Sequence, residues 1–213
     1  MKRVLLTLSI TILALTARGD SIVFSSFTPP DTGTTYNSGF AWVTKGQSTT
    51  GGLLETAAQF TAMSSGDLAT VELGLTYVTQ GPVNAFLYAD ASGSPGTNLG
   101  LLGTGTPTDA FQSTDHNIVS FAVGGLVPVT MGTNYWLILK PDTTSTNDTW
   151  NLSLPAVTGK VDQSIDDSTW VVASDMMPAF RVTAIAVPEP SMLSLIGVGL
   201  VSLLMFRKGF AKR

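Results

Sequence analysis

The sequence of 213 residues lacks cysteine altogether and has a single histidine, His116. The absence of cysteine excludes disulfides, thiol nucleophiles and cysteine-ligated metals, and one imidazole excludes metal sites that need two. A Ser-His-Asp triad would have to use His116, but its neighbour Asp115 points to the opposite face of an extended segment. No Gly-x-Ser-x-Gly elbow is present either. We therefore expect His116 to be a solvated loop residue.

Basic residues are also scarce once the two ends of the chain are set aside. Residues 20–187 contain fourteen acidic residues and only four basic ones, which gives this part a net charge of −10 although the whole chain has −4. The four basic residues are Lys45, Lys140, Lys160 and Arg181. Phosphate backbones are bound by clustered Lys and Arg, so the composition excludes a nucleic-acid partner. Anionic lipids would repel the same segment.

The body of the chain has few helix formers and is rich in Thr, Ser, Gly and Val, a mixture typical of short strands and tight turns. Apolar and polar residues alternate at period two. This pattern predicts an all-β fold, an antiparallel β-sandwich resembling a jelly roll with about ten strands. The predicted strands are residues 22–27, 40–44, 56–62, 71–77, 83–89, 118–123, 135–139, 150–154, 170–173 and 180–186.

The connections between these strands are predicted from their turn residues. Gln80-Gly81-Pro82 separates two alternating runs, so residues 71–77 and 83–89 are expected to pair as a hairpin. Residues 90–100 are rich in Gly, Ser, Pro and Asn, and residues 141–149 are rich in Thr, Asn and Asp. Both segments are therefore predicted to be longer loops.

The N-terminus has the pattern of a secretory signal. Lys2 and Arg3 precede an apolar stretch at residues 4–15, and Ala17-Arg18-Gly19 offers a small-x-small cleavage site. We predict a signal peptide at residues 1–19 with the mature protein beginning near Asp20. Cleavage after Ala17 and an uncleaved membrane anchor are the alternatives.

The C-terminus, residues 187–213, combines three features in a fixed order. Pro188, Glu189 and Pro190 form a break, residues 192–206 form an uncharged apolar run, and the end is basic, with Arg207, Lys208, Lys212 and Arg213. As a helix the apolar run would be roughly 22 Å long, short of the ~30 Å hydrocarbon core, and snorkelling basic residues could compensate. We predict a transmembrane helix at residues 192–206, with the basic end on the cytoplasmic side.

This tripartite end resembles the sorting signal of the bacterial PEP-CTERM proteins. The resemblance implies recognition by an exosortase-type membrane transpeptidase, removal of the helix and delivery of the body to the cell surface or extracellular matrix. An ordinary C-terminal membrane anchor is the alternative. Leu87-Tyr88-Ala89-Asp90 with Gly93-Ser94-Pro95-Gly96, and Gly132-Thr133-Asn134-Tyr135-Trp136, resemble the extracellular domains called choice-of-anchor R. That resemblance covers roughly residues 37–184 and implies an exported β-sandwich with no known reaction. We predict that the β-sandwich domain spans residues 20–186.

Two kinds of site remain open in the body. Asp162, Asp166 and Asp167 are weak candidates for a structural calcium ion, the one cofactor that the sequence leaves open, although turn aspartates commonly cap backbone amides instead. Trp150 and Trp170 are candidates for a platform against which sugar rings stack, with core packing as the alternative.

The function expected from these features is that of an exported surface or matrix protein that is not an enzyme. Its β-sandwich would be structural or adhesive within an extracellular polymer layer. A carbohydrate-binding module that contacts extracellular polysaccharide is the alternative. A polysaccharide-acting enzyme would need two facing carboxylates. Glu55 and Glu72 are available, but Glu72 alternates with core residues and is expected to face solvent.

Overall fold

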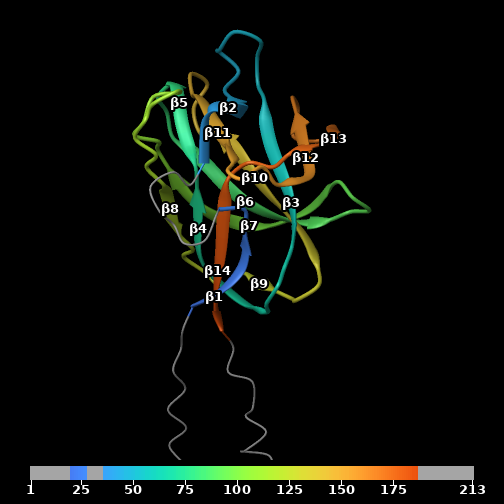
Figure 1. Ribbon diagram of the computed structural model, residues 1–213. Helices are drawn as coiled ribbons and strands as arrows, with labels where there is room; N and C mark the ends of the chain where they lie inside the picture. Colours follow the sequence, from blue (N-terminus) through green and yellow to red (C-terminus); the bar gives the residue numbers. More distant parts are fainter. Residues whose placement is uncertain (1–19, 28–35, 187–213) are drawn as a thin grey trace, which may run out of the picture. The chain divides into compact units, whose positions relative to one another are not determined.

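The computed structural model describes residues 20–27 and 36–186, and all regular secondary structure within them is β-strand (Figure 1). No helix among these residues is long and apolar enough to cross a membrane. The predicted signal peptide at residues 1–19, the sorting residues 188–190, the helix at 192–206 and the basic end all lie outside the described residues.

The strands form three sheets in which every ladder is antiparallel. The first sheet has the order β1 (Asp20–Ser25), β14 (Phe180–Ala186), β4 (Gly66–Leu73) and β8 (Val119–Ala122), and β9 (Pro128–Val129) also pairs with β4. The second has the order β2 (Tyr36–Lys45), β11 (Asn147–Ser153) and β5 (Leu75–Thr79). The third has the order β13 (Trp170–Met176), β12 (Thr158–Ser164), β3 (Glu55–Thr61), β10 (Asn134–Pro141), β6 (Val83–Asp90) and β7 (Pro95–Gly105). The predicted all-β antiparallel fold is confirmed.

The first two sheets join at Gly74, the single residue between β4 and β5. Its N–H donates to the Ala179 carbonyl at 3.0 Å and its carbonyl accepts the Asn151 N–H at 2.9 Å. A Cβ at Gly74 would lie 2.6 Å from the Tyr36 ring, so the junction needs a residue without a side chain. The two sheets thereby form one continuous layer of the sandwich, and the third sheet forms the other.

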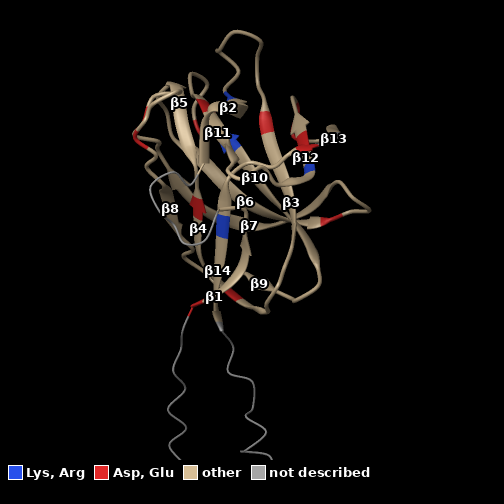
Figure 2. Ribbon diagram, viewed as in Figure 1, with Lys and Arg blue, Asp and Glu red and all other residues tan. Residues whose placement is uncertain are grey.

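The core lies between these two layers and follows from the alternation in the sequence. One face of each strand supplies apolar side chains, and all three sheets contribute. An aromatic group fills the centre, where Phe180 packs against Phe24, Phe60 and Trp150 with ring centroids 4.8–6.0 Å apart. Charged residues are few and scattered over the strands (Figure 2), so burial of these apolar faces is the main stabilising contribution.

Three predictions about connections were wrong. Residues 71–77 are split at Gly74 into β4 and β5, and β6 pairs with β10 and β7 in the opposite layer, so no hairpin forms across Gln80-Gly81-Pro82. Residues 90–100 hold only a tight turn, because β6 runs to Asp90 and β7 begins at Pro95. The last three residues of the predicted loop at 141–149 belong to β11. The split at Gly74 and three strands that the pattern did not predict, β7, β9 and β12, give fourteen strands in the described part rather than ten.

The first and last strands of the body are neighbours in the same sheet. Asp20 pairs with Ile185, and residues 181–185 of β14 lie between β1 and β4. The chain therefore enters and leaves this unit at the same end, where β1 and β14 are labelled in Figure 1.

Candidate functional site

The outer face of the third sheet, which points away from the core, has a second cluster of apolar and charged side chains. Trp136 and Ile138 of β10 point to this face, yet both are fully buried. Trp170 packs against the cluster from β13, which is separated from β10 by β12 and β3. The cluster also includes Ala57 of β3, so it extends across the outer face from β6 to β13.

Asp90 fixes one side of this cluster. Its carboxylate accepts hydrogen bonds from the Trp136 indole at 2.8 Å, from the Gln59 amide at 2.6 Å and from the Gly93 N–H at 3.1 Å. Burial alone would raise its pKa, but these donors hold the pKa of Asp90 below its usual value. Asp90 is therefore a positioning residue that holds Trp136 in place.

Lys140 lies at the centre of the same face. Its Nζ atom is 5.3 Å from the ring centroids of both Phe86 and Tyr88, which is cation–π range. The same atom lies 3.9 Å from Glu55 Oε2 and contacts Asp167 Oδ1. Burial would lower its pKa, but the hydrogen bond to Asp167 and the other partners raise the pKa of Lys140 above its usual value. The ammonium group is thus held between rings and carboxylates.

Two carboxyl groups on this face are buried. Burial raises the pKa of Glu55 to about 7, although the Lys140 ammonium acts in the opposite direction. Burial likewise raises the pKa of Asp162 to about 6, and neither of its carboxyl oxygens has a hydrogen-bond partner among the described residues. Both groups are therefore able to hold a proton near neutral pH.

The three aspartates predicted as weak calcium ligands have separate surroundings. Asp166 accepts hydrogen bonds from the backbone N–H groups of Thr169 and Ser168 at 2.6 and 3.0 Å, and these hold its pKa well below the usual range. Asp167 contacts Lys140, and Asp162 is buried on β12. Among the described residues no group of three or more acidic or histidine side chains is placed to hold a metal ion. Asp162, Asp166 and Asp167 therefore do not form such a group.

The predicted sugar platform was wrong at Trp150. Its side chain is fully buried, its indole N–H donates to the Ala179 carbonyl at 3.0 Å, and its ring packs on Phe180. Trp170 belongs to the other cluster, on the outer face of the third sheet. The two tryptophans therefore do not form a common surface. His116 lies in a loop, as predicted, with its ring 5.1 Å from the Tyr36 ring.

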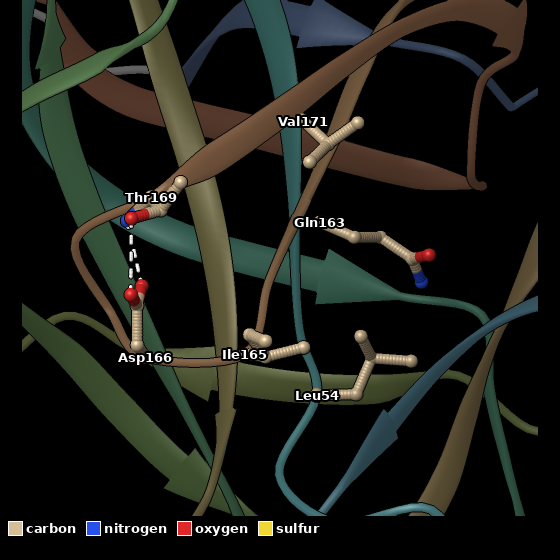
Figure 3. Close-up of a pocket in the computed structure, with 6 residues that line it drawn as sticks. All are labelled: Leu54, Gln163, Ile165, Asp166, Thr169 and Val171. Carbon is tan, nitrogen blue, oxygen red and sulfur yellow. Dashed lines mark hydrogen bonds between the residues drawn. The ribbon is translucent and has the colours of Figure 1, made fainter.

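Two hollows lie along β13. The larger, of about 350 Å³, is drawn in Figure 3 and is lined by Leu54, Gln163, Ile165, Asp166, Thr169 and Val171. Its walls are mostly apolar, Ile165 and Val171 are about 70% exposed, and the Asp166 carboxylate bonds back to Thr169 within the turn. It is a shallow surface, and the Gln163 amide nitrogen on its wall lies 3.4 Å from the Val43 carbonyl oxygen and from Thr56 Oγ1.

The smaller hollow, of about 210 Å³, lies between β2 and the end of β13 and is lined by Phe40, Ala41, Trp42, Leu152, Asp175 and Met176. A register shift in β2, where Asn37 and Ala41 pair with successive residues of β11, pushes the intervening residues outward. Phe40 is consequently 65% exposed, while the Trp42 indole N–H is held by the Met176 carbonyl at 2.9 Å. Sequence reasoning missed this pair, although two aromatics two residues apart in the predicted strand 40–44 were a visible signal.

Comparison with known proteins adds the identity of the C-terminal end. Residues 186–208 match the family model of the PEP-CTERM protein-sorting motif, while no curated protein and no solved structure matches the chain. The fold and the motif together define an exported, envelope-associated protein with an all-β body. More particularly, the chain carries a PEP-CTERM sorting signal and is a substrate for processing by exosortase, a membrane enzyme. The resemblance to choice-of-anchor R domains stays a prediction.

Proposed function

We propose that residues 20–186 act as a non-enzymatic structural or adhesive module that is displayed in the extracellular polymer layer. The observation that carries this proposal is the position of β14. The sorting motif begins at residue 186, the last residue of β14, and this strand is hydrogen-bonded to β1 on one side and β4 on the other. The strand next to the attachment point is therefore among the best-supported strands of the body.

A tether at this end would direct an applied force along β14, the direction in which its ladders resist separation best. Ladder bonds in antiparallel pairs lie perpendicular to the strands. A force along β14 consequently acts on all its bonds to β1 and β4 at once, in shear. Pulling Asp20 away from Ala186 would instead open the β1–β14 pair one bond at a time, because these residues lie at the same end of the sheet.

We also propose that the body is not an enzyme, because the Glu55 and Glu72 carboxylates each lie against a basic side chain. The Glu72 carboxylate pairs with Arg181 at 2.5 Å on the outer face of the first layer. Glu55 is buried against Lys140 in the other layer, with only 6% of its side chain exposed. A glycosidase would need two carboxyl groups facing each other across an accessible bond, and this pair does not offer them.

Force spectroscopy on the purified exported protein tests the mechanical proposal. The chain has no cysteine, so Ser48→Cys gives a single attachment point in the loop between β2 and β3, at the end of the body away from Asp20 and Ala186 (Figure 1). Pulling between this introduced thiol and the C-terminal end of the body should require a clearly higher force than pulling between its two ends. Equal forces in both geometries would contradict the proposal.

A carbohydrate-binding module is the second candidate, and the hollow beside Phe40 and Trp42 favours it. An exposed aromatic ring, an indole fixed by its own N–H and the exposed carboxylate of Asp175 combine a stacking surface with a hydrogen-bond acceptor. Extracellular polysaccharide presents hydroxyl groups and ring faces that suit such a surface. Adhesion would then act through this groove.

A further inference from the structure

Lys140, Asp167 and Glu55 come from three separate segments and meet at one point. Lys140 is the next-to-last residue of β10, Asp167 lies in the turn between β12 and β13, and Glu55 begins β3. The Lys140 Nζ atom contacts Asp167 Oδ1, and Glu55 Oε2 lies 3.9 Å from the same nitrogen. The turn is fixed in place, because the carboxylate of Asp166 accepts the N–H groups of Ser168 and Thr169.

The backbone at Asp167 supports a specific role for its side chain. Asp167 has a φ of 61°, in the left-handed region that few residues other than glycine adopt. Aspartate adopts this region more readily than most residues, but a sharp turn does not require a carboxylate there. In this turn Asp167 is the left-handed residue. Its side chain contacts Lys140 of β10, and β10 lies two strands away from β12 in the sheet.

The surroundings of the contact are largely apolar. Only 13% of the Lys140 side chain and 6% of the Glu55 side chain are exposed, and the rings of Phe86 and Tyr88 flank the ammonium group. An ion pair taken out of water loses hydration that its mutual attraction only partly replaces. Burial by itself favours the neutral amine, but the carboxylate partners outweigh it and hold the pKa of Lys140 above its usual value, so the neutral amine is the minor species.

We propose that Lys140 and Asp167 become joined by an intramolecular amide bond. The Nζ lone pair of the neutral amine attacks Asp167 Cγ, the C–N bond forms, and one C–O bond of the carboxyl group breaks. The proton lost by nitrogen and the proton needed by the departing oxygen balance, so the ammonium and carboxylate become one amide and one water molecule. No oxidant, reductant or activating group is consumed.

Glu55 is placed to move these protons. Its Oε2 atom lies 3.9 Å from the nitrogen and has no hydrogen-bond partner among the described residues. Its pKa of about 7, raised by burial, allows it to accept a proton from the amine and return it to the leaving oxygen. The Asp167 side chain is 50% exposed, which gives the released water a path to solvent.

Proximity supplies the driving force that the condensation lacks between free molecules. Groups held together within one structure react with effective molarities of roughly 10⁵–10⁸ M. The bond would close a loop between residues 27 positions apart and tie the edge hairpin of β12 and β13 to the central strand β10. A chain without cysteine would thereby gain a covalent cross-link that does not depend on redox conditions. This inference is independent of the proposed function.

Peptide mapping of the purified exported protein tests the bond directly. Within the body trypsin can cut after Lys45, Lys160 and Arg181, but not after Lys140, because Pro141 follows it. Complete digestion after denaturation should yield residues 46–160 and 161–181 joined in one branched species, lighter than the two separate peptides by one water molecule. Tandem mass spectrometry should place the branch at Lys140 and Asp167.

Matched variants identify the reacting residues. Lys140→Arg and Asp167→Ala should each release the two peptides separately, and Arg before Pro141 leaves the digestion map unchanged. Glu55→Gln should slow the reaction and leave a large unlinked fraction, while Lys160→Arg and Asp175→Asn should remain linked. Far-ultraviolet circular dichroism confirms that each variant is folded. Separate peptides from folded wild-type protein, or linked peptides from Asp167→Ala, would overturn the proposal.

Discussion

Trp150 and Phe180 join the second sheet to the first at the centre of the sandwich. Their ring centroids are 5.4 Å apart, and the Trp150 indole N–H donates to the carbonyl of Ala179, the residue before Phe180. Both side chains are fully buried. The continuous layer formed by these two sheets is thus held by side-chain packing as well as by the backbone bonds at Gly74.

Removal of the Phe180 ring should be among the most destabilising changes in the body. Phe180→Ala deletes contacts with Phe24, Phe60 and Trp150 and leaves a cavity, so we expect a loss of about 3–5 kcal/mol in the free energy of unfolding. Chemical denaturation followed by tryptophan fluorescence measures this loss. Phe40→Ala, at a ring that is 65% exposed, is the control and should change stability by less than about 0.5 kcal/mol.

Gly74 should tolerate no side chain. A Cβ there would meet the Tyr36 ring at 2.6 Å, and the ring is held by its hydroxyl, which donates to the Asn117 carbonyl at 3.1 Å. Gly74→Ala should therefore lower the unfolding free energy by about 1–3 kcal/mol. Gly125→Ala, where a Cβ would meet nothing within 4 Å, serves as the matched change. Equal stability of the two variants would contradict the packing at the junction.

Stability should fall as pH rises from about 5 to about 8. Burial raises the pKa of Asp148 to about 8, against the opposing effect of the Gly81 amide, from an ordinary value of 3.8. Between these values the folded state binds a proton that the unfolded state has lost, so the contribution is complete below pH 4 and disappears as pH passes 8. Glu55 and Asp162 act in the same direction.

Asp148→Asn isolates this contribution. The variant should flatten the decrease of unfolding free energy between pH 5 and 8 by an amount on the order of a few kcal/mol, measured by urea denaturation at several pH values. Asp115→Asn, at an exposed loop aspartate, should leave the slope unchanged. A wild-type stability that rises over this interval would contradict the assignment of a neutral, buried Asp148.

The fold class could be predicted from the sequence because alternation at period two is a local signal. Val71 and Leu73, on either side of Glu72, face the core, as the alternation predicted. Pairing between distant strands is not local, so the apparent hairpin around Gly81 was misassigned. The break at Gly74 could be recognised only from its contact with Tyr36.

The site predictions rested on residue type, which does not indicate where a side chain lies in the folded sheets. Trp150 follows a polar segment and was expected outside, but its strand lies in the middle of the second sheet and its ring turns inward. The cluster around Lys140 combines residues from β10, β3 and the β12–β13 turn. No spacing in the sequence indicates that they meet.

Carbohydrate binding, if it contributes to adhesion, should depend on the groove beside Phe40. On a glycan array the exported protein should bind polysaccharide fragments, and Phe40→Ala and Trp42→Ala should each reduce that binding at least tenfold through lost stacking. Leu99→Ala, at an exposed apolar residue on β7, should bind like the wild type. Binding that survives both groove changes would place the ligand elsewhere.

Glu189 should be required for maturation. It is the acidic residue of the Pro188-Glu189-Pro190 sequence within the matched motif, and Glu189→Gln should leave the full-length precursor in the membrane fraction. Glu72→Gln, in the body, should mature normally. Immunoblotting of membrane and surface fractions distinguishes the two, and normal processing of Glu189→Gln would remove the motif from the account.

The intact mass of the protein recovered from the cell surface or extracellular matrix measures directly whether the C-terminal segment has been removed. Processing by exosortase predicts a C-terminus near the Pro188-Glu189-Pro190 sequence, with residues 192–213 absent. Recovery of a surface form that retains the apolar run at 192–206 and the basic residues up to Arg213 would contradict it.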